Sequence, residues 1–436
     1  MARVPVSVEP VARSFAPEAL GTAVHLRGWV LRSRSSGGIA FLLVRDRTGS
    51  VQVTARRDAI GAEGFDKVEH LPGESVVEVE GTVHADARAP GGREVRASAV
   101  RLLQVSEPFP IWSDQTEEFR LDHRHLTVRT QEMVAMVRLK AAMLRAFREF
   151  FDREEVLETT PPILSGNAAE GGSEAFTLDY FGKPGYLGQT AQLYLEALIA
   201  PHERVYALTS SFRAEKSRTP RHLTEYLHLE AELAWCDLEE LMQFVERMLR
   251  QVLAELARRA PEELRLLGRE PSELTSLPEP FPRVTYAEAL ERLRAKNFDL
   301  HWGSDIATAE ERALSLEERA PLFLTHFPRE LKAFYMLQSP HDERTVEAFD
   351  LLAPEGYGEL VGASCRETDN TRLRERLVAT GVNPEEYAWY LDLRRYGSVP
   401  HAGFGLGIER VLRWVTRREH IRDTTPFPRT PARLTP

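Results

Sequence analysis

Residues 403–410 read Gly403-Phe404-Gly405-Leu406-Gly407-Ile408-Glu409-Arg410, and this stretch says most about the fold. Glycine fills every second position from 403 to 407, and alternate positions of an extended strand share one face. A strand face without side chains lets a planar ligand lie against the backbone. The pattern after Gly407 favours a helix, so we expect Arg410 near its first turn. The sequence therefore predicts a strand that turns directly into a helix beside a flat ligand.

Dinucleotide-binding loops also use closely spaced glycines, but they need a βαβ unit near the start of a domain. The run at 403–410 lies about 30 residues from the C-terminus, so we reject that reading.

Two strand-like runs precede this stretch and carry acidic residues. Phe349-Asp350-Leu351-Leu352 is followed by a run from Gly358 to Arg366 that contains Glu359. Asp350 and Glu359 are nine residues apart on strands that we expect to adjoin. Two carboxylates in that arrangement can share a hard cation such as Mg²⁺, with phosphate oxygens completing its octahedron.

A third run mixes arginines with carboxylates. Arg213 and Glu215 are two residues apart, which places them on one face of a strand, and a basic loop follows them. A strand–loop–strand unit with inward-pointing Arg, Glu and His can clamp a polyphosphate and a purine together. On this local pattern alone, a solvated charged hairpin accounts for the same residues.

The remaining sequence predicts an α+β protein. Five short strands and one helix near 63–71 indicate a small closed barrel in residues 1–106. Pro108-Phe109-Pro110 begins a linker at 107–130, and an amphipathic helix is expected over 131–153, at the start of a second domain at 131–436. Residues 238–319 are expected to form a helical insertion in that domain.

Composition excludes several classes of protein. The 436 residues are 42% apolar and 28% charged, which is typical of a globular chain. No apolar run is long enough to span a membrane, and residues 1–5 do not resemble a secretory signal, so we expect a cytoplasmic protein. Two cysteines, 129 positions apart, cannot form a disulfide framework. The net charge of −10 argues against a polycation but leaves room for a local basic face.

Taken together, the three runs resemble class II aminoacyl-tRNA synthetases of the aspartate/asparagine/lysine subgroup. Pro161 matches motif 1, Arg213 with Glu215 matches motif 2, and 407–410 matches motif 3. The resemblance implies an OB-fold anticodon-binding barrel followed by a catalytic domain with an antiparallel sheet flanked by helices. It also implies a homodimer formed through motif 1, with ATP, Mg²⁺ and tRNA as cofactors and partners.

The resemblance assigns a role to individual residues of the catalytic domain. Arg213 and Arg410 match the catalytic arginines, and Asp350 and Glu359 match the magnesium ligands. ATP would contact Arg213, Glu215, Arg221, His222, Leu223, Tyr226, Glu359, Gly407 and Arg410. The amino acid would contact Glu170, Gln192, Arg213, Glu225 and Arg366.

Asparagine is the expected substrate because of the residues near its side chain. Aspartate enzymes of this subgroup read Gln-Leu-Tyr-Lys, whereas this chain has Leu195 in place of that lysine. Arg366 would donate to the carboxamide oxygen, and Glu225 would accept from the carboxamide nitrogen. The segments 332–336, 396–401 and 423–429 also look like the asparagine type. The run 362–366 departs from the usual Gly-Gly-Ser-Gln-Arg at Ala363 and Cys365, which leaves the shape of the pocket open.

In the barrel, the resemblance assigns anticodon contacts to Arg34, Phe41 and Gln52. Phe41 on an alternating strand would otherwise be an ordinary core residue. The expected partners are tRNA(Asn), asparagine and ATP. An aspartate enzyme, possibly charging both tRNAs, is the main alternative, and a non-catalytic tRNA-binding paralogue is the second. An asparagine-making relative would usually lack the barrel.

Overall fold

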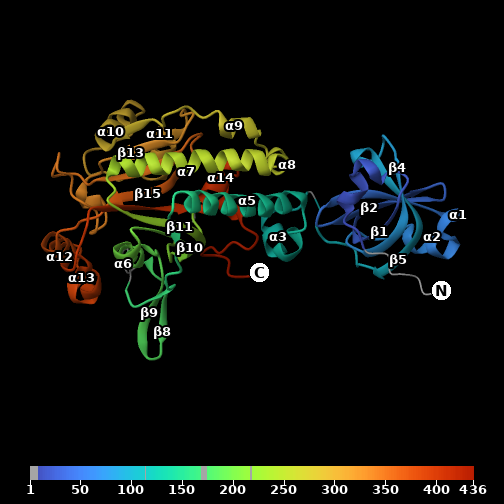
Figure 1. The fold of residues 1–436 in the computed structure, drawn as a ribbon, viewed down its shortest axis with the longest axis horizontal. Coiled ribbons are helices and arrows are strands. Elements are labelled where there is room, and N and C mark those ends of the chain that lie inside the picture. Colours follow the sequence, from blue (N-terminus) through green and yellow to red (C-terminus); the bar gives the residue numbers. More distant parts are fainter. Residues whose placement is uncertain (1–7, 113, 168–173, 217–218) are drawn as a thin grey trace. The chain divides into compact units, whose positions relative to one another are not determined.

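The computed structural model describes residues 8–112, 114–167, 174–216 and 219–436. The chain forms two compact units, Met1–Gln115 and Thr116–Pro436. The division falls inside the segment 107–130 that the sequence indicated as a linker. Among the described residues, no helix is both long and apolar enough to cross a membrane. Figure 1 shows the elements of both units.

The first unit is a closed five-stranded barrel, as predicted, and its strand order is β1-β2-β3-β5-β4. Val, Leu and Ala side chains alternate inward along its strands and fill the core. Gly28 is needed on β1 because a Cβ there would lie 2.3 Å from the carbonyl oxygen of Arg45. Its main elements are β1 (Ala23–Ser36), β2 (Ile39–Asp46), β3 (Gly49–Arg56), α1 (Arg57–Ile60), α2 (Ala62–Val68), β4 (Val76–Ala85) and β5 (Arg93–Gln104), with short 3-10 turns at Val11–Phe15, Pro17–Ala19 and Pro90–Gly92.

An eight-stranded sheet organises the second unit, in the order β12-β13-β14-β15-β16-β11-β10-β6. Its neighbours are antiparallel except at the two edges, where β12–β13 and β10–β6 are parallel. The strands are β6 (Leu157–Glu158), β10 (Arg204–Phe212), β11 (Glu225–Ala234), β12 (Arg283–Thr285), β13 (Leu322–Thr325), β14 (Ala348–Ala353), β15 (Gly358–Cys365) and β16 (His401–Gly407). A small separate sheet contains β7 (Leu164–Ser165), β8 (Thr177–Tyr180) and β9 (Lys183–Leu187).

Long helices cover one face of this sheet. The amphipathic helices α5 (Gln131–Arg153) and α7 (Leu238–Arg259) lie side by side and bury their apolar stripes against it (Figure 1). Thr130 and Asp237 cap their N-termini by accepting backbone N–H bonds. The other helices of the unit are α3 (Glu117–Asp122), α4 (Arg124–Thr127), α6 (Gln192–His202), α8 (Pro261–Leu266), α9 (Pro271–Thr275), α10 (Tyr286–Ala295), α11 (Thr308–Ser315), α12 (Asn370–Ala379), α13 (Ala388–Arg395) and α14 (Ile408–Val415), with short 3-10 turns at Arg329–Leu331, Pro384–Tyr387 and Ile421–Thr424.

The region 238–319, for which the sequence indicates a helical insertion, contains helices α7 to α11 and also the short edge strand β12. Val284 and Tyr286 pack there in a satellite core with Leu322 and Leu324 of β13. The insertion therefore extends the sheet as well as flanking it.

Candidate active site

The face of the sheet opposite α5 and α7 carries the polar side chains. On β11, Leu229, Ala231 and Leu233 pack into the helix-covered core. His228, Glu230 and Glu232 alternate with them and line a cavity of about 780 Å³ on the other face. This alternation is the ordinary period of a strand, and it decides which residues can meet a ligand.

Arg366, which follows β15, lies at one end of this cavity. Its Nε and Nη2 donate to the two oxygens of Glu232 at 2.9 Å each, and its Nη1 donates to Ser364 Oγ at 2.6 Å. Both side chains are buried, and such a bidentate ion pair fixes the guanidinium plane. Three of the five guanidinium N–H groups are used in this way, and among the described residues the other two make no hydrogen bond, so they could donate to a substrate oxygen.

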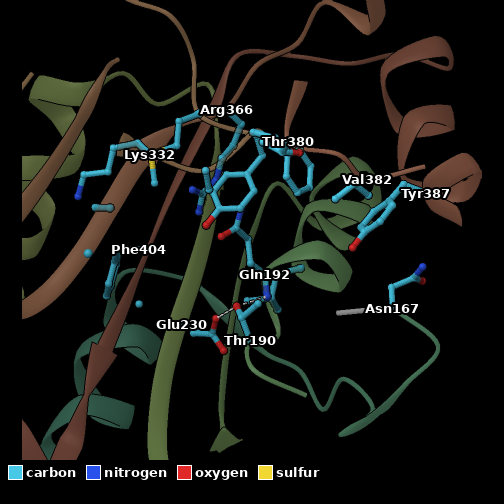
Figure 2. A pocket seen from close by; sticks show the side chains of 18 of the residues that line it. Asn167, Thr190, Gln192, Glu230, Lys332, Arg366, Thr380, Val382, Tyr387 and Phe404 are labelled. Carbon is cyan, nitrogen blue, oxygen red and sulfur yellow. Dashed lines mark hydrogen bonds between the residues drawn. The ribbon is translucent and has the colours of Figure 1, made fainter. Parts of the chain in front are cut away.

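Gln192 and Glu230 line the same cavity as Arg366, and Glu230 lies beside Thr190 (Figure 2). Glu230 accepts hydrogen bonds from the Thr190 hydroxyl and from the backbone N–H of Ala191, the latter at 2.8 Å. It thereby ties β11 to the start of α6. Leu195 of α6 also lines the cavity. The cavity wall is therefore apolar at the position where aspartate enzymes of the subgroup have a lysine.

A second cavity adjoins the first at Arg213 and Glu359 and contains most of the residues assigned to ATP. Arg213 Nη1 lies 3.6 Å from Glu215 Oε1, and its guanidinium lies 6.0 Å from the Tyr226 ring centroid. Arg410, in the first turn of α14, lies 3.0 Å from Glu359 Oε2. The lining residues of this cavity include Arg213, Arg221, His222, Leu223, Tyr226, Glu359, Gly407 and Arg410.

The loop between β10 and β11 contributes Arg221 and His222 to this cavity. Arg221 Nη1 donates to Glu311 Oε2 of α11, and that same oxygen accepts the backbone N–H of Glu359 at 2.9 Å. Burial, followed by the charge of Arg410, lowers the pKa of His222 to about 4. His222 is therefore uncharged near neutral pH.

The two acids assigned to a metal converge over Gly362. A Cβ at Gly362 would lie 3.4 Å from Glu359 Oε1 and 3.8 Å from Asp350 Oδ1. Lys332 Nζ donates to both oxygens of Asp350, at 2.8 and 3.0 Å. Burial raises the pKa of Glu359, but the charges of Arg410 and Lys332 lower it further and hold it at about 2. Two carboxylates over a glycine, beside a cavity, form a donor set that suits Mg²⁺.

The alternating glycines of β16 do more than expose its backbone. A Cβ at Gly403 would lie 2.0 Å from Glu232 Oε2, and one at Gly405 would lie 2.5 Å from His228 Nε2. These glycines therefore make room for β11 side chains. The expectation of a bare ligand-facing strand holds only in part, because Gly405 and Gly407 also line the second cavity.

Glu225 does not lie where the sequence analysis placed it. It is exposed at the start of β11 and lines a different cavity, together with Lys140, Leu227 and Arg429. The strand period explains the correction, because 225 is odd, like the core-facing positions 227 and 229. Glu230, on the cavity-facing set, is the carboxylate that the analysis missed, and counting alternate positions along β11 from His228 would have found it.

Two other expectations concern the pocket shape and the loop before it. Glu170 lies outside the described residues. Cys365 packs into the helix-covered core, so its departure from the usual sequence leaves the cavity lining unchanged there. Ala363 does line the cavity.

In the barrel, Phe41 is not a core residue. It is partly exposed on β2, between the buried neighbours Ala40 and Leu42, and the Arg34 guanidinium lies 4.8 Å from its ring centroid. Gln52 on β3 is buried, and its Nε2 lies 3.4 Å from Glu94 Oε2. Arg34 and Phe41 are therefore available to a ligand, whereas Gln52 is largely covered.

Comparisons with known proteins agree with this architecture. The family described as "tRNA synthetases class II (D, K and N)" matches residues 116–431, and the "OB-fold nucleic acid binding domain" matches residues 24–103. An asparagine–tRNA ligase of Pyrococcus furiosus is 46% identical over 96% of this chain and 98% of its own length.

Solved structures give the same result. Asparaginyl-tRNA synthetase from Pyrococcus horikoshii, complexed with asparaginyl-adenylate, superposes with a TM-score of 0.96 at 44% identity, covering 99% of this chain and all of that one. The Entamoeba histolytica enzyme, also with asparaginyl-adenylate, gives a TM-score of 0.88 at 32% identity over 95% of this chain and 97% of that one. The chain belongs to the class II tRNA synthetases of the D, K and N group.

Proposed function

We propose that this protein activates asparagine with ATP and transfers it to tRNA(Asn). The single observation that carries the choice of amino acid is that Arg366 and Glu230 line one cavity, whose wall has Leu195 instead of a lysine. Arg366 can donate to a carboxamide oxygen, and Glu230 can accept from a carboxamide nitrogen. A carboxylate in the same place would face Glu230 and be repelled. The similarity to asparagine–tRNA ligases supports the same substrate.

Activation needs positioning and positive charge rather than a nucleophile on the enzyme. An oxygen of the asparagine α-carboxylate forms a bond to the α-phosphorus of ATP, and the bond from that phosphorus to the bridging oxygen breaks, so that pyrophosphate leaves. Arg213, between the two cavities, would hold the α-phosphate and the substrate carboxylate. The charged Arg410 and Arg221 would hold the outer phosphates, and the uncharged His222 would contribute a hydrogen bond to them. Fixed charges of this kind stabilise the transition state without reorganisation.

Other residues of the second cavity would hold the nucleoside. Glu215 would accept from the adenine amino group, and Tyr226 would stack on the ring. Asp350 and Glu359 would hold Mg²⁺, which when bound neutralises phosphate charge. On the amino-acid side, Gln192 would meet the α-ammonium group through its oxygen, because its Nε2 already donates to Glu196 at 3.0 Å.

The same proposal covers the partners. Arg34 and Phe41 would contact the anticodon, and a homodimer would form through the segment around Pro161. Charging of tRNA would take place in the cytoplasm.

ATP–pyrophosphate exchange with each amino acid tests this function. The wild-type protein should activate asparagine and leave aspartate nearly untouched near neutral pH, because mismatched polar groups are rejected by factors on the order of 10⁴. Glu230→Gln should weaken this discrimination, since an amide no longer repels a carboxylate. Glu246→Gln, which removes a buried carboxylate away from the cavity, is the matched control and should keep the wild-type discrimination. Exchange with aspartate that equals exchange with asparagine would favour an aspartate enzyme, and no exchange with either would favour the non-catalytic paralogue.

A further inference from the structure

A fully buried cluster of charged side chains lies directly behind the amino-acid end of the cavity. Its centre is Glu196 of α6, whose carboxylate accepts from Arg394 Nη2 at 2.5 Å and from the Tyr390 hydroxyl at 2.8 Å. His401 Nε2 lies 3.2 Å from the same carboxylate. The side chain of Glu196 is entirely shielded from solvent. These contacts come from α6, α13 and β16, so three separate elements meet at one carboxylate.

The cluster is continuous with the residues that line the cavity. Glu196 Oε1 accepts from Gln192 Nε2 at 3.0 Å and lies 3.9 Å from Arg366 Nε. Arg366 in turn is paired with Glu232. Gln192, Arg366 and Glu232 line the cavity, whereas Glu196 and Arg394 lie behind them. A carboxylate in this position can reach a bound amino acid only through its charge and through the side chains it orients.

The charges of this cluster nearly compensate one another. It contains two guanidinium groups, Arg366 and Arg394, and two carboxylates, Glu196 and Glu232. Burial opposes ionisation of Glu196, but the charge of Arg394 and the hydrogen bond to His401 hold its pKa well below the usual range. Glu196, Glu232 and His401 also have the spacing of a metal site. The arginines already occupy both carboxylates, so the cluster is a salt-bridge network.

The balance of charge in this cluster affects which amino acid the cavity can bind. Asparagine and aspartate have nearly the same shape, so the field of the pocket must help to separate them. A buried positive charge that lacks a partner would attract the aspartate side chain, and this attraction is strong where water is excluded. Glu196 removes one such charge from the arginine pair.

We propose that Glu196 is a specificity-determining residue, which compensates the Arg366–Arg394 pair and so denies an aspartate side chain the net positive charge it would need. This inference rests on the proposed use of asparagine. It adds a residue that touches no substrate atom to the direct contacts of Arg366 and Glu230.

Pyrophosphate exchange with both amino acids tests the inference in Glu196→Gln. The amide keeps the size of the side chain and loses its charge. The ratio of kcat/KM for aspartate to kcat/KM for asparagine should rise by about tenfold or more. The reason is that loss of the buried Glu196 charge, just behind the cavity wall, changes the binding of a charged side chain by at least about that factor. The double variant Glu196→Gln/Arg394→Met removes a positive charge as well, and the ratio should return toward the wild-type value. A purely structural role would lower both activities and leave the ratio where it was.

Controls separate this result from general damage. Glu246→Gln removes another buried carboxylate, which bonds to Arg250 and to the backbone of Phe281 away from the cavity, and its ratio should match the wild type. Each variant should keep a cooperative melting transition. If Glu196→Gln does not fold, Arg394→Met alone carries the test, and the inhibition constant of aspartate against asparagine should rise at least about threefold. Folded variants that all keep the wild-type ratio and inhibition constant would overturn the inference. Failure of the wild type to activate asparagine would instead overturn the proposed function.

Discussion

At the scale of single residues, Arg410 offers the most direct test of the ATP site. It lies in the first turn of α14, 3.0 Å from Glu359 Oε2, in the cavity assigned to the phosphates. Arg410→Ala should slow pyrophosphate exchange about a hundredfold or more, which corresponds to about 3 kcal/mol of lost charge stabilisation. Arg417→Ala is the matched control, because Arg417 forms exposed ion pairs with Glu273 and Glu355 and should leave exchange unchanged. Near-normal exchange in Arg410→Ala would remove this residue from the site.

His222 makes the stability of the protein depend on pH, and the sign of this dependence follows from the pKa of His222. The folded protein holds that pKa at about 4, below the ordinary value of about 6.5 that applies to the unfolded chain. Between these values the unfolded state binds more protons, so His222 lowers the free energy of unfolding as the pH falls from about 6.5 to about 4. His222→Asn should therefore reduce the loss of melting temperature between pH 7 and pH 5. His70→Asn, at an exposed position of the barrel, should not. If the melting temperature of His222→Asn falls between pH 7 and pH 5 as much as that of the wild type, His222 is not the group responsible.

Residue identities were predicted better than residue directions. The motifs located Arg213, Arg366 and Arg410, and the structure brings all three to adjoining cavities. Glu225 was predicted in place of Glu230, because residue type along the run does not show which face of β11 each side chain lies on. Glu196 bonds to Arg394 and His401, which are 198 and 205 positions away along the chain, and no local pattern indicates a contact of that range.

At the scale of elements, helix α11 connects the insertion to the ATP site. Its buried Glu311 accepts from Arg221 and from the backbone N–H of Glu359. Glu311→Gln should raise the KM for ATP by about tenfold, because a charge-assisted hydrogen bond of about 1.5 kcal/mol no longer positions Arg221. The KM for asparagine should change little. Glu310→Gln, one residue earlier on α11, is the control, and equal effects of both variants would show that α11 contributes stability only.

Strand β2 makes a similar test possible in the barrel. Its inward residues Ala40 and Leu42 fill the core, and Phe41 between them is partly exposed beside Arg34. Stacking of a base on an aromatic ring is worth about 1–3 kcal/mol. Phe41→Ala should therefore weaken aminoacylation of tRNA about tenfold and leave pyrophosphate exchange intact. Loss of tRNA-independent exchange, or of the melting transition of the barrel, would contradict an anticodon role.

Elements with a clear period were predictable, and those defined by pairing were not. The helix expected over 131–153 forms as α5, and the closed barrel forms from its five strands. β12 has only three residues and becomes a strand because β13 pairs with it in parallel. Such a short edge strand has too few positions to show alternation, so the insertion was expected to be wholly helical.

At the scale of the whole molecule, the edge of the large sheet bears on the oligomeric state. β6 is the last strand in the sheet order. The N–H and C=O groups on the outer side of an edge strand can pair with another chain. Leu157 on β6 is 48% exposed, and Ile163 and Leu164 nearby are 40% and 48% exposed. Pro161 lies among them. These exposed apolar side chains are close along the chain, and apolar surface of this kind is what the proposed homodimer would bury.

We expect the protein to sediment as a dimer and Leu157→Glu to sediment as a monomer, because two carboxylates brought together in an apolar interface would each lose hydration without gaining a partner. Sedimentation velocity at several protein concentrations measures this directly. Val378→Glu on α12 is the control, since Val378 is 60% exposed and lies far along the chain from this patch, and that variant should remain dimeric. A wild-type protein that sediments as a monomer at micromolar concentration would contradict the interface. A Leu157→Glu variant that remains a dimer would place the interface on another surface of the catalytic unit.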